Sequence, residues 1–222
     1  GEHTVDGFRC YYKVAEPSAP VAGAIPVVMV HGFGISSFHF SKNMEAIAEA
    51  TGAPVYAVDL LGFGKSEKPT YASYGEPLWT WQVQELVTEV IKAPKVFLAG
   101  HSMGAYVCMN VAWQIQSNVA GLCLINPAGR YGSIVPAEIV PLVGDFLRIQ
   151  PVSKAVGQWL YDRNSKPETL RGTLEGIYKD KSMVTNDLIN AVLEPAAGGD
   201  AKVVGPQLFA SLFSSERGKR WD

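Results

Sequence analysis

One long stretch in the middle of the chain carries no charged side chain. Between Lys95 and Arg130 there is no Asp, Glu, Lys or Arg, although the chain as a whole has 19 basic and 21 acidic residues. A segment of this kind must be buried on nearly every side, which is typical of central parallel strands and the helix between them. We therefore expect a strand at Val96–Ala99, a core helix at Met103–Gln116 and another strand at Val119–Ile125.

The residues before this stretch alternate short apolar runs with segments of helical period. This alternation predicts the α/β class, with a mostly parallel sheet that has helices on both faces. The expected strands are Ile25–Val30 and Pro54–Val58, and the expected helices are Phe38–Ala50 and Thr80–Ile91. Phe8–Val14 is expected to add an antiparallel strand at the edge of the sheet.

Beyond Arg130 the pattern changes to helices interrupted by Pro and Gly. We therefore expect two regions, a core over residues 1–130 and a helical lid or cap over residues 131–222. The helices predicted in the second region are Ala137–Ile149, Ser153–Tyr161, Glu168–Lys179, Asp187–Leu193 and Gln207–Phe213.

Composition excludes several classes of protein. A net charge of −2 and a pI near 6.1 argue against nucleic acid as a partner, because duplex binding usually needs a basic stripe and a high pI. The apolar runs are too short for a transmembrane segment. Three cysteines without metal-like spacing predict no metal, no disulfide framework and a soluble protein of a reducing compartment. No cofactor is expected.

The sequence Gly100-His101-Ser102-Met103-Gly104 lies where a predicted strand ends and a predicted helix begins. In a G-x-S-x-G nucleophile elbow, the serine occupies a sharp turn, and the flanking glycines let strand and helix pack closely around it. The alternative is a tight turn with an idle serine. The apolar segments on both sides favour the elbow, with Ser102 as the catalytic nucleophile.

A second motif, His31-Gly32-Phe33-Gly34, directly follows the expected strand Ile25–Val30. Acyl transfer needs two backbone N–H groups aimed at the developing oxyanion, one after the nucleophile and one from an earlier loop. These donors would be the N–H groups of Met103 and Phe33. The alternative is a plain turn. His31 is interpreted as a structural hydrogen-bonding residue and not as a base.

The third motif is a loop that begins at Asp59 and ends at Gly64-Lys65-Ser66. The end of this loop is like that of a phosphate-binding loop, but that pattern needs its first glycine where this chain has Asp59. Nucleotide binding is therefore not expected. We expect Asp59 to hold the backbone of the loop together.

These motifs resemble the α/β-hydrolase family from Phe8 to about Gly132. The strings HGFGISSFHF, DLLGFGKSEKP, WTWQVQEL, GHSMG and LINPAGRYG are similar to the branch of photosynthetic organisms that includes pheophytinase and related plastid hydrolases. The resemblance implies an eight-stranded sheet, a Ser-acid-His triad in that chain order, a helical lid after the sixth strand and a plastid or chloroplast location. The elbow has His101 where pheophytinase typically has Asn, so the resemblance assigns no particular substrate.

The chain has four histidines, His3, His31, His39 and His101, and none follows Ser102. We expect the triad acid and histidine to lie beyond Asp222, so that the 222 residues alone are close to inactive. His39 is expected to be a packed or surface residue. The strand Val119–Ile125 would then form an apolar sheet edge, which we expect the rest of the protein or a partner protein to cover.

Three functional hypotheses follow from these patterns. The first is a serine hydrolase that cleaves a carboxylic ester of a bulky apolar substrate, with Phe146, Trp159 and Tyr161 of the lid shaping the pocket. The second is a non-catalytic structural or assembly subunit of a larger complex, for which the resemblance suggests a photosynthetic one. The third is a receptor that binds a small molecule without turning it over.

Overall fold

The computed structural model describes residues 1–127 and 150–214. The chain forms two compact units, of which the first comprises residues 1–68 and 76–129 and the second residues 69–75 and 130–222. The first unit is an α/β structure, as predicted. In the described part of the chain, no helix is long and apolar enough to cross a membrane.

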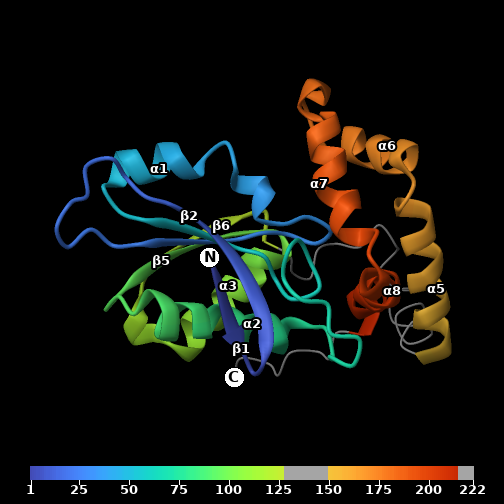
Figure 1. The fold of residues 1–222 in the computed structure, drawn as a ribbon, viewed down its shortest axis with the longest axis horizontal. Helices are drawn as coiled ribbons and strands as arrows, with labels where there is room; N and C mark the ends of the chain where they lie inside the picture. Colours follow the sequence, from blue (N-terminus) through green and yellow to red (C-terminus); the bar gives the residue numbers. More distant parts are fainter. Residues whose placement is uncertain (128–149, 215–222) are drawn as a thin grey trace, which may run out of the picture. The chain divides into compact units, whose positions relative to one another are not determined.

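A six-stranded mixed sheet forms the centre of the first unit (Figure 1). Its strand order is β1-β2-β4-β3-β5-β6. The last four strands in that order are parallel to one another, and β2 runs antiparallel to β4. The strands are β1 (Glu2–Val5), β2 (Phe8–Ala15), β3 (Val27–Val30), β4 (Val55–Val58), β5 (Val96–His101) and β6 (Val119–Ile125).

The prediction that Phe8–Val14 forms the edge of the sheet is wrong. β2 lies between β4 and β1, and β1 pairs with it as an antiparallel hairpin. The hairpin turn is Asp6-Gly7, with φ of 49° and 83°. Two adjacent residues with positive φ are what a tight hairpin turn requires, and Asp-Gly is a preferred pair for it.

Helices cover both faces of this sheet (Figure 1). Helix α1 (Met44–Thr51) packs on β2 and β4, whereas α3 (Met103–Gln114) packs on β5 and on α2 (Glu76–Glu85). A π-helical segment, η2 (Leu86–Ile91), extends α2. On the α1 side the core consists of apolar side chains from three strands, η1 and α1: Val27, Met29, Phe40, Met44, Ala48, Val55, Ala57 and Ala99.

The helix predicted at Phe38–Ala50 is divided. A short 3-10 helix, η1 (Ser37–Phe40), comes first, and α1 starts only at Met44. The Ser36 side chain accepts a hydrogen bond from the Phe38 N–H and so caps η1. This local bond ends the preceding loop and starts a separate helical turn.

The uncharged middle stretch is buried in β5 and on much of α3, but β6 is not buried. Within the described residues β6 pairs with β5 alone and is the last strand of the sheet. Leu122 and Ile125 are each 44% exposed, and Phe97 of β5 is 43% exposed. The expectation of burial on nearly every side is therefore not met by this strand in the 222 residues, whereas the expectation that Val119–Ile125 forms an apolar sheet edge is confirmed.

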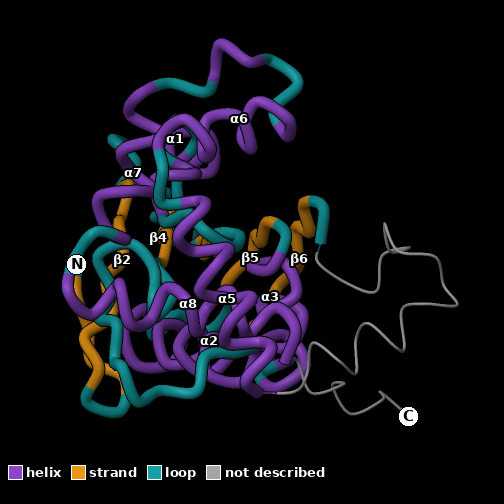
Figure 2. The backbone as a smooth tube through the Cα atoms, turned by 90° about the vertical axis from the view of Figure 1, so that its right-hand side faces the viewer, coloured by secondary structure: helices purple, strands orange, loops and turns teal. Residues whose placement is uncertain are grey.

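Residues 150–214 of the second unit are helical apart from their connections (Figure 2). Its helices are α5 (Gln150–Asn164), α6 (Pro167–Ile177), η4 (Lys181–Met183), α7 (Asn186–Ala196) and α8 (Gly199–Ser214). Helices α5 and α8 approach closely at two glycines. A Cβ atom on Gly157 would overlap the Pro206 carbonyl, and one on Gly205 would overlap the Tyr161 ring. The helix predicted at Ala137–Ile149 lies outside the described residues.

Candidate active site

Ser102 lies on the turn between β5 and α3, and its backbone has φ of 53° and ψ of −117°. The Ser102 N–H donates to the carbonyl of Ile125 at 2.9 Å. The Ser102 carbonyl accepts from the N–H groups of Ala105 at 3.1 Å and Tyr106 at 3.3 Å. The turn is thus bonded to β6 on one side and to the first turn of α3 on the other.

The glycines of the motif are required by close packing. A Cβ atom on Gly100 would overlap the backbone of Ala105, and one on Gly104 would overlap the carbonyls of Val30 and His31. The strand, the turn and the helix can therefore approach each other only if positions 100 and 104 lack a side chain. The G-x-S-x-G spacing in this chain has that steric origin.

The loop that follows β3 lies directly against this turn. An ideal Cβ on Gly32 would be 3.2 Å from the Ser102 Cβ and 3.0 Å from the His101 Nδ1. Phe33 is the next residue of the loop, and Met103 is the first residue of α3, where N–H groups have no partner inside the helix. The structure thus brings both predicted oxyanion donors into the segments beside Ser102, and their role as donors stays a prediction.

Gly34, the last residue of this loop motif, has φ of 76°. This left-handed conformation favours glycine, since a Cβ atom would be strained there. Backbone conformation, and not crowding, therefore favours glycine at this position, because no atom lies within 4 Å of an added Cβ.

His31 is fully buried and holds the loop ends together. Its Nε2 accepts the Leu60 N–H at 3.0 Å, and its Nδ1 is 2.7 Å from the Gly32 carbonyl. A neutral ring with its proton on Nδ1 satisfies both bonds. Burial lowers the pKa of His31, which also favours the neutral form. His31 is therefore a structural hydrogen-bonding residue in this structure.

Asp59 holds three segments around the end of β4. It is 1% exposed, and its two carboxylate oxygens accept the N–H groups of Ser37 and Lys65, each at 2.7 Å. A Cβ on Gly64, which has φ of 51°, would overlap this carboxylate. The predicted role of Asp59 in tying the loop backbone is confirmed by these bonds.

Two residues of α2 that were not singled out from the sequence complete this network. The Gln82 side chain accepts the Leu61 N–H at 2.7 Å and donates to the Asp59 carbonyl at 2.9 Å. The Trp79 indole N–H donates to the Leu61 carbonyl at 3.0 Å. The sequence signal for this role was a polar residue, Gln82, beside Val83 in an otherwise apolar stripe. A buried amide needs hydrogen-bond partners, which here are backbone groups.

His39 and His101 stack on each other. Their ring centroids are 4.6 Å apart and their planes differ by 20°. Burial lowers the pKa of His39 to about 4, with smaller contributions from His101 and His31. Burial also lowers the pKa of His101. Both rings are therefore neutral near pH 7, and His39 is a packed residue.

None of these histidines is bonded to the nucleophile. Within residues 1–127 and 150–214, no hydrogen bond joins the Ser102 hydroxyl to an imidazole. Asp162 lies in α5, where its carboxylate accepts from the Gln158 amide at 2.8 Å. The same described residues contain no group of three His, Cys, Asp or Glu side chains that could hold a metal ion.

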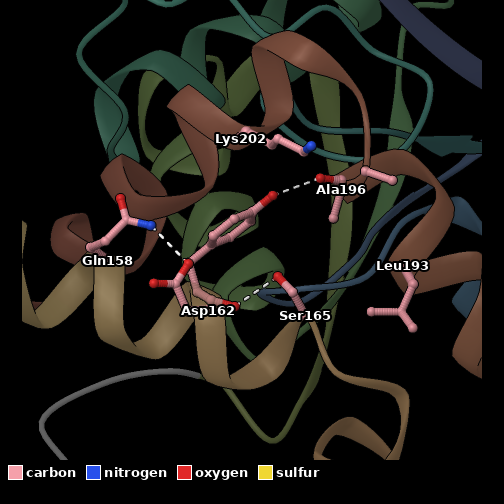
Figure 3. A pocket seen from close by; sticks show the side chains of 8 residues that line it. Gln158, Asp162, Ser165, Leu193, Ala196 and Lys202 are labelled. Carbon is pink, nitrogen blue, oxygen red and sulfur yellow. Dashed lines mark hydrogen bonds between the residues drawn. The ribbon is translucent and has the colours of Figure 1, made fainter.

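The second unit contains a cavity of about 460 Å³ between α5, α7 and α8 (Figure 3). Tyr161 lines this cavity and donates its hydroxyl proton to the Ala196 carbonyl at 2.7 Å. Trp159 is 57% exposed, and the Arg163 guanidinium lies 5.4 Å from its ring. Phe146, the third predicted pocket residue, lies outside the described residues.

Comparison with known proteins identifies the class that this fold and elbow define. A model of the alpha/beta hydrolase family matches residues 27–214. The chain therefore belongs to the α/β-hydrolase family. A solved probable hydrolytic enzyme from Pseudomonas aeruginosa shares the fold with a TM-score of 0.70 and 19% identity, over 96% of this chain and 64% of that one.

Two curated relatives are similar in sequence. The mouse protein named 1-acylglycerol-3-phosphate O-acyltransferase ABHD5 is 33% identical over 112 residues, which are 49% of this chain and 31% of the relative. Lipase 1 of Psychrobacter immobilis is 26% identical over 178 residues, which are 78% of this chain and 54% of the lipase. The chain thus spans about a third to a half of these relatives.

Proposed function

We propose that this chain carries the nucleophile and oxyanion hole of a serine hydrolase that cleaves a carboxylic ester of a bulky apolar substrate. The observation that carries the proposal is Ser102 at φ 53° on a strand-to-helix turn, with the position of a Cβ on Gly32 only 3.2 Å from the Ser102 Cβ. A non-glycine residue in such a conformation persists only where its surroundings impose it, and such residues cluster at active sites.

In the proposed reaction, the Ser102 hydroxyl oxygen attacks the ester carbonyl carbon and gives its proton to a histidine base. The carbonyl oxygen becomes an oxyanion that the Phe33 and Met103 N–H groups stabilise. Collapse of this intermediate expels the alcohol, which takes the proton from the histidine. Water then attacks the acyl-serine carbonyl and gives its proton to the histidine. The second oxyanion collapses to the free acid, and the Ser102 oxygen leaves and takes the proton from the histidine.

The base is proposed to come from a segment outside the 222 residues. His31 is occupied by two backbone bonds, and His39 and His101 are stacked on each other. Removing the base of a serine hydrolase lowers kcat by about 10⁶. The separate 222-residue chain would therefore show almost no turnover.

The apolar substrate is proposed from the second unit and from the relatives. A helical lid over residues 131–222 with Phe146, Trp159 and Tyr161 would offer aromatic surface to an acyl or alkyl chain. The relative from Psychrobacter immobilis is named a lipase, and a bovine relative is named a (lyso)-N-acylphosphatidylethanolamine lipase. Membership of the plastid branch, with a chloroplast location, stays a proposal that the motif strings alone support.

A second candidate is acyl transfer to an alcohol in place of water. The name of the mouse relative, an O-acyltransferase, favours this candidate. The same acyl-serine would form, and the acceptor alone would differ. Adding a long-chain alcohol or lysolipid during ester turnover would divert the acyl group into a new ester, whereas a strict hydrolase would release only the free acid.

A non-catalytic assembly subunit is the third candidate. A partner protein that covers Val119–Ile125 would be part of that role. The small-molecule receptor is the fourth candidate. Its ligand would be bound stoichiometrically and recovered unchanged.

Labelling of the full-length natural protein with a fluorophosphonate probe tests the hydrolase. Mass spectrometry should place the adduct on Ser102, and Ser102→Ala should abolish it. Ser117→Ala is the matched control, because Ser117 is exposed on η3 (Gln116–Asn118) and away from the elbow. A folded protein that the probe fails to label would contradict the hydrolase and favour the assembly subunit.

A further inference from the structure

Among the described residues, packing and not hydrogen bonding holds the His101 ring. Its Nδ1 is buried and has no hydrogen-bond partner in the described part of the chain. One face of the ring stacks on His39, and the Nδ1 lies 3.0 Å from the position of a Cβ on Gly32. The ring therefore fills the space between η1 and the loop that carries Phe33.

His39 is itself fixed from the core. Its ring meets the Phe40 ring edge to face, with centroids 5.1 Å apart. Phe40 is 4% exposed and belongs to the core beneath α1. The Asp59 carboxylate anchors the start of η1 by accepting the Ser37 N–H. A packed series of contacts thus runs from the core through His39 and His101 to Gly32.

We propose that His39 is a positioning residue, which sets the separation of the two oxyanion donors by stacking on His101. This proposal rests on the proposed function, since it assigns the N–H groups of Phe33 and Met103 to the oxyanion. The two donors belong to different segments, so their spacing depends on what separates the loop from the elbow. The His101 ring occupies that place, and its buried Nδ1 has no hydrogen-bond partner in residues 1–127 and 150–214 that would fix its orientation.

The geometry explains why the stacking partner matters. An oxyanion hole works because its donors are in place before charge develops, and a displacement of about 1 Å can lower a rate by about 10². Without the His39 ring, the His101 ring would lose its contact on one face and could rotate toward the vacated space. Gly32 and Phe33 would then lose their fixed distance from Ser102.

The test compares three variants of the full-length natural protein. His39→Ala removes the stack, and His39→Phe keeps a ring in the same place. His3→Ala is the matched control, because His3 is a half-buried histidine on β1 whose ring also packs on an aromatic ring, that of Tyr12, at 5.7 Å. The first readout is the second-order rate of Ser102 labelling by a fluorophosphonate probe.

We expect His39→Ala to slow labelling about tenfold, and His39→Phe to restore the rate to within about twofold of the natural protein. His3→Ala should leave the rate unchanged. A second readout is the amide resonances of Phe33 and Met103 in NMR spectra, which should shift in His39→Ala and keep their positions in His39→Phe and in His3→Ala.

Equal labelling rates in His39→Ala and His3→Ala would overturn the inference. If the natural protein is not labelled at all, the proposed hydrolase fails, and the amide resonances then decide the positioning role separately. Unshifted Phe33 and Met103 resonances in His39→Ala would overturn it, and selectively shifted ones would support it.

Discussion

Replacing Asp59 should destabilise the first unit strongly. In Asp59→Ala the N–H groups of Ser37 and Lys65 lose their acceptors. A buried donor without a partner costs about 1–3 kcal/mol. Ser37 is 2% exposed, whereas Lys65 is exposed, so that water can reach its N–H and lower the cost there. We expect a total loss of about 3–4 kcal/mol in the free energy of unfolding.

The isosteric variant Asp59→Asn refines this prediction. One amide oxygen can still accept one of the two N–H groups, but the amide NH₂ then faces the other donor. The loss should therefore be intermediate, at about 2 kcal/mol. Asp180→Asn is the matched control, because Asp180 also accepts a backbone N–H, that of Ser182 at 3.0 Å, but on the exposed surface. Its effect should be small.

Urea unfolding followed by tryptophan fluorescence measures these differences. Trp79 is a suitable reporter, since it is 4% exposed and its indole donates to the Leu61 carbonyl beside Asp59. The midpoint should fall while the slope of the transition stays unchanged. If Asp59→Ala loses no more stability than Asp180→Asn, the carboxylate does not hold this loop and the reasoning is refuted.

Three further predictions concern the elbow, the stacked histidines and the exposed strand. Gly104→Ala should lower the free energy of unfolding by at least about 3 kcal/mol, because its Cβ would overlap two backbone carbonyls. Gly172→Ala, whose Cβ would have no atom within 4 Å, should raise the stability of α6 by about 0.5–1 kcal/mol in thermal unfolding. Acidification from about pH 6.5 to 4 should lower the Tm, because unfolded His39 binds a proton below its usual pKa of 6.5 while the folded residue does so only near 4. Leu122→Lys should lower the self-association of the 222-residue chain, measured by light scattering, because it places a charge on the exposed strand β6.

Each of these predictions has a contradicting result. Equal stability of the two glycine variants would remove the steric account of the elbow. In His39→Phe the decline of Tm with acid should be shallower, and an unchanged slope would show that another group is responsible. A natural 222-residue chain that is monomeric at high concentration would show that its β6 surface does not associate.

Five of the six strands of the sheet could be predicted from local apolar runs, whereas β1, which has no such run, was missed. Val96–Ala99 and Val119–Ile125 were expected, and β5 and β6 contain them. The helix boundaries were less accurate, because they depend on local bonds and on packing. Helix α2 begins at Glu76, before the expected Thr80, and α8 begins at Gly199 although its glycines and Pro206 discouraged that prediction. The Asp6-Gly7 turn was a readable signal that was missed.

In the candidate site too, the features with a local origin were predicted, and the contacts between distant segments were not. Ser102, Gly100 and Gly104 were identified from a motif whose spacing has a local steric origin. The stack of His39 on His101 could not be read from the sequence, since the two residues are far apart in the chain and neither forms a motif with the other. Gln82 was detectable as a polar residue beside an apolar stripe, but its two bonding partners at the end of β4 could not be read from the sequence. Contacts between distant segments are the part that requires the fold.

The conformation of Ser102 has a consequence for the stability of the whole protein. A non-glycine residue at φ 53° and ψ −117° raises the energy of the folded state by about 1–3 kcal/mol. Ser102→Gly would relieve most of this strain, so the variant without the nucleophile should melt at a higher temperature than the natural protein. The strained turn that carries the Ser102 hydroxyl thus lowers the stability of the folded chain. Selection for thermal resistance alone would favour replacement of Ser102 by glycine.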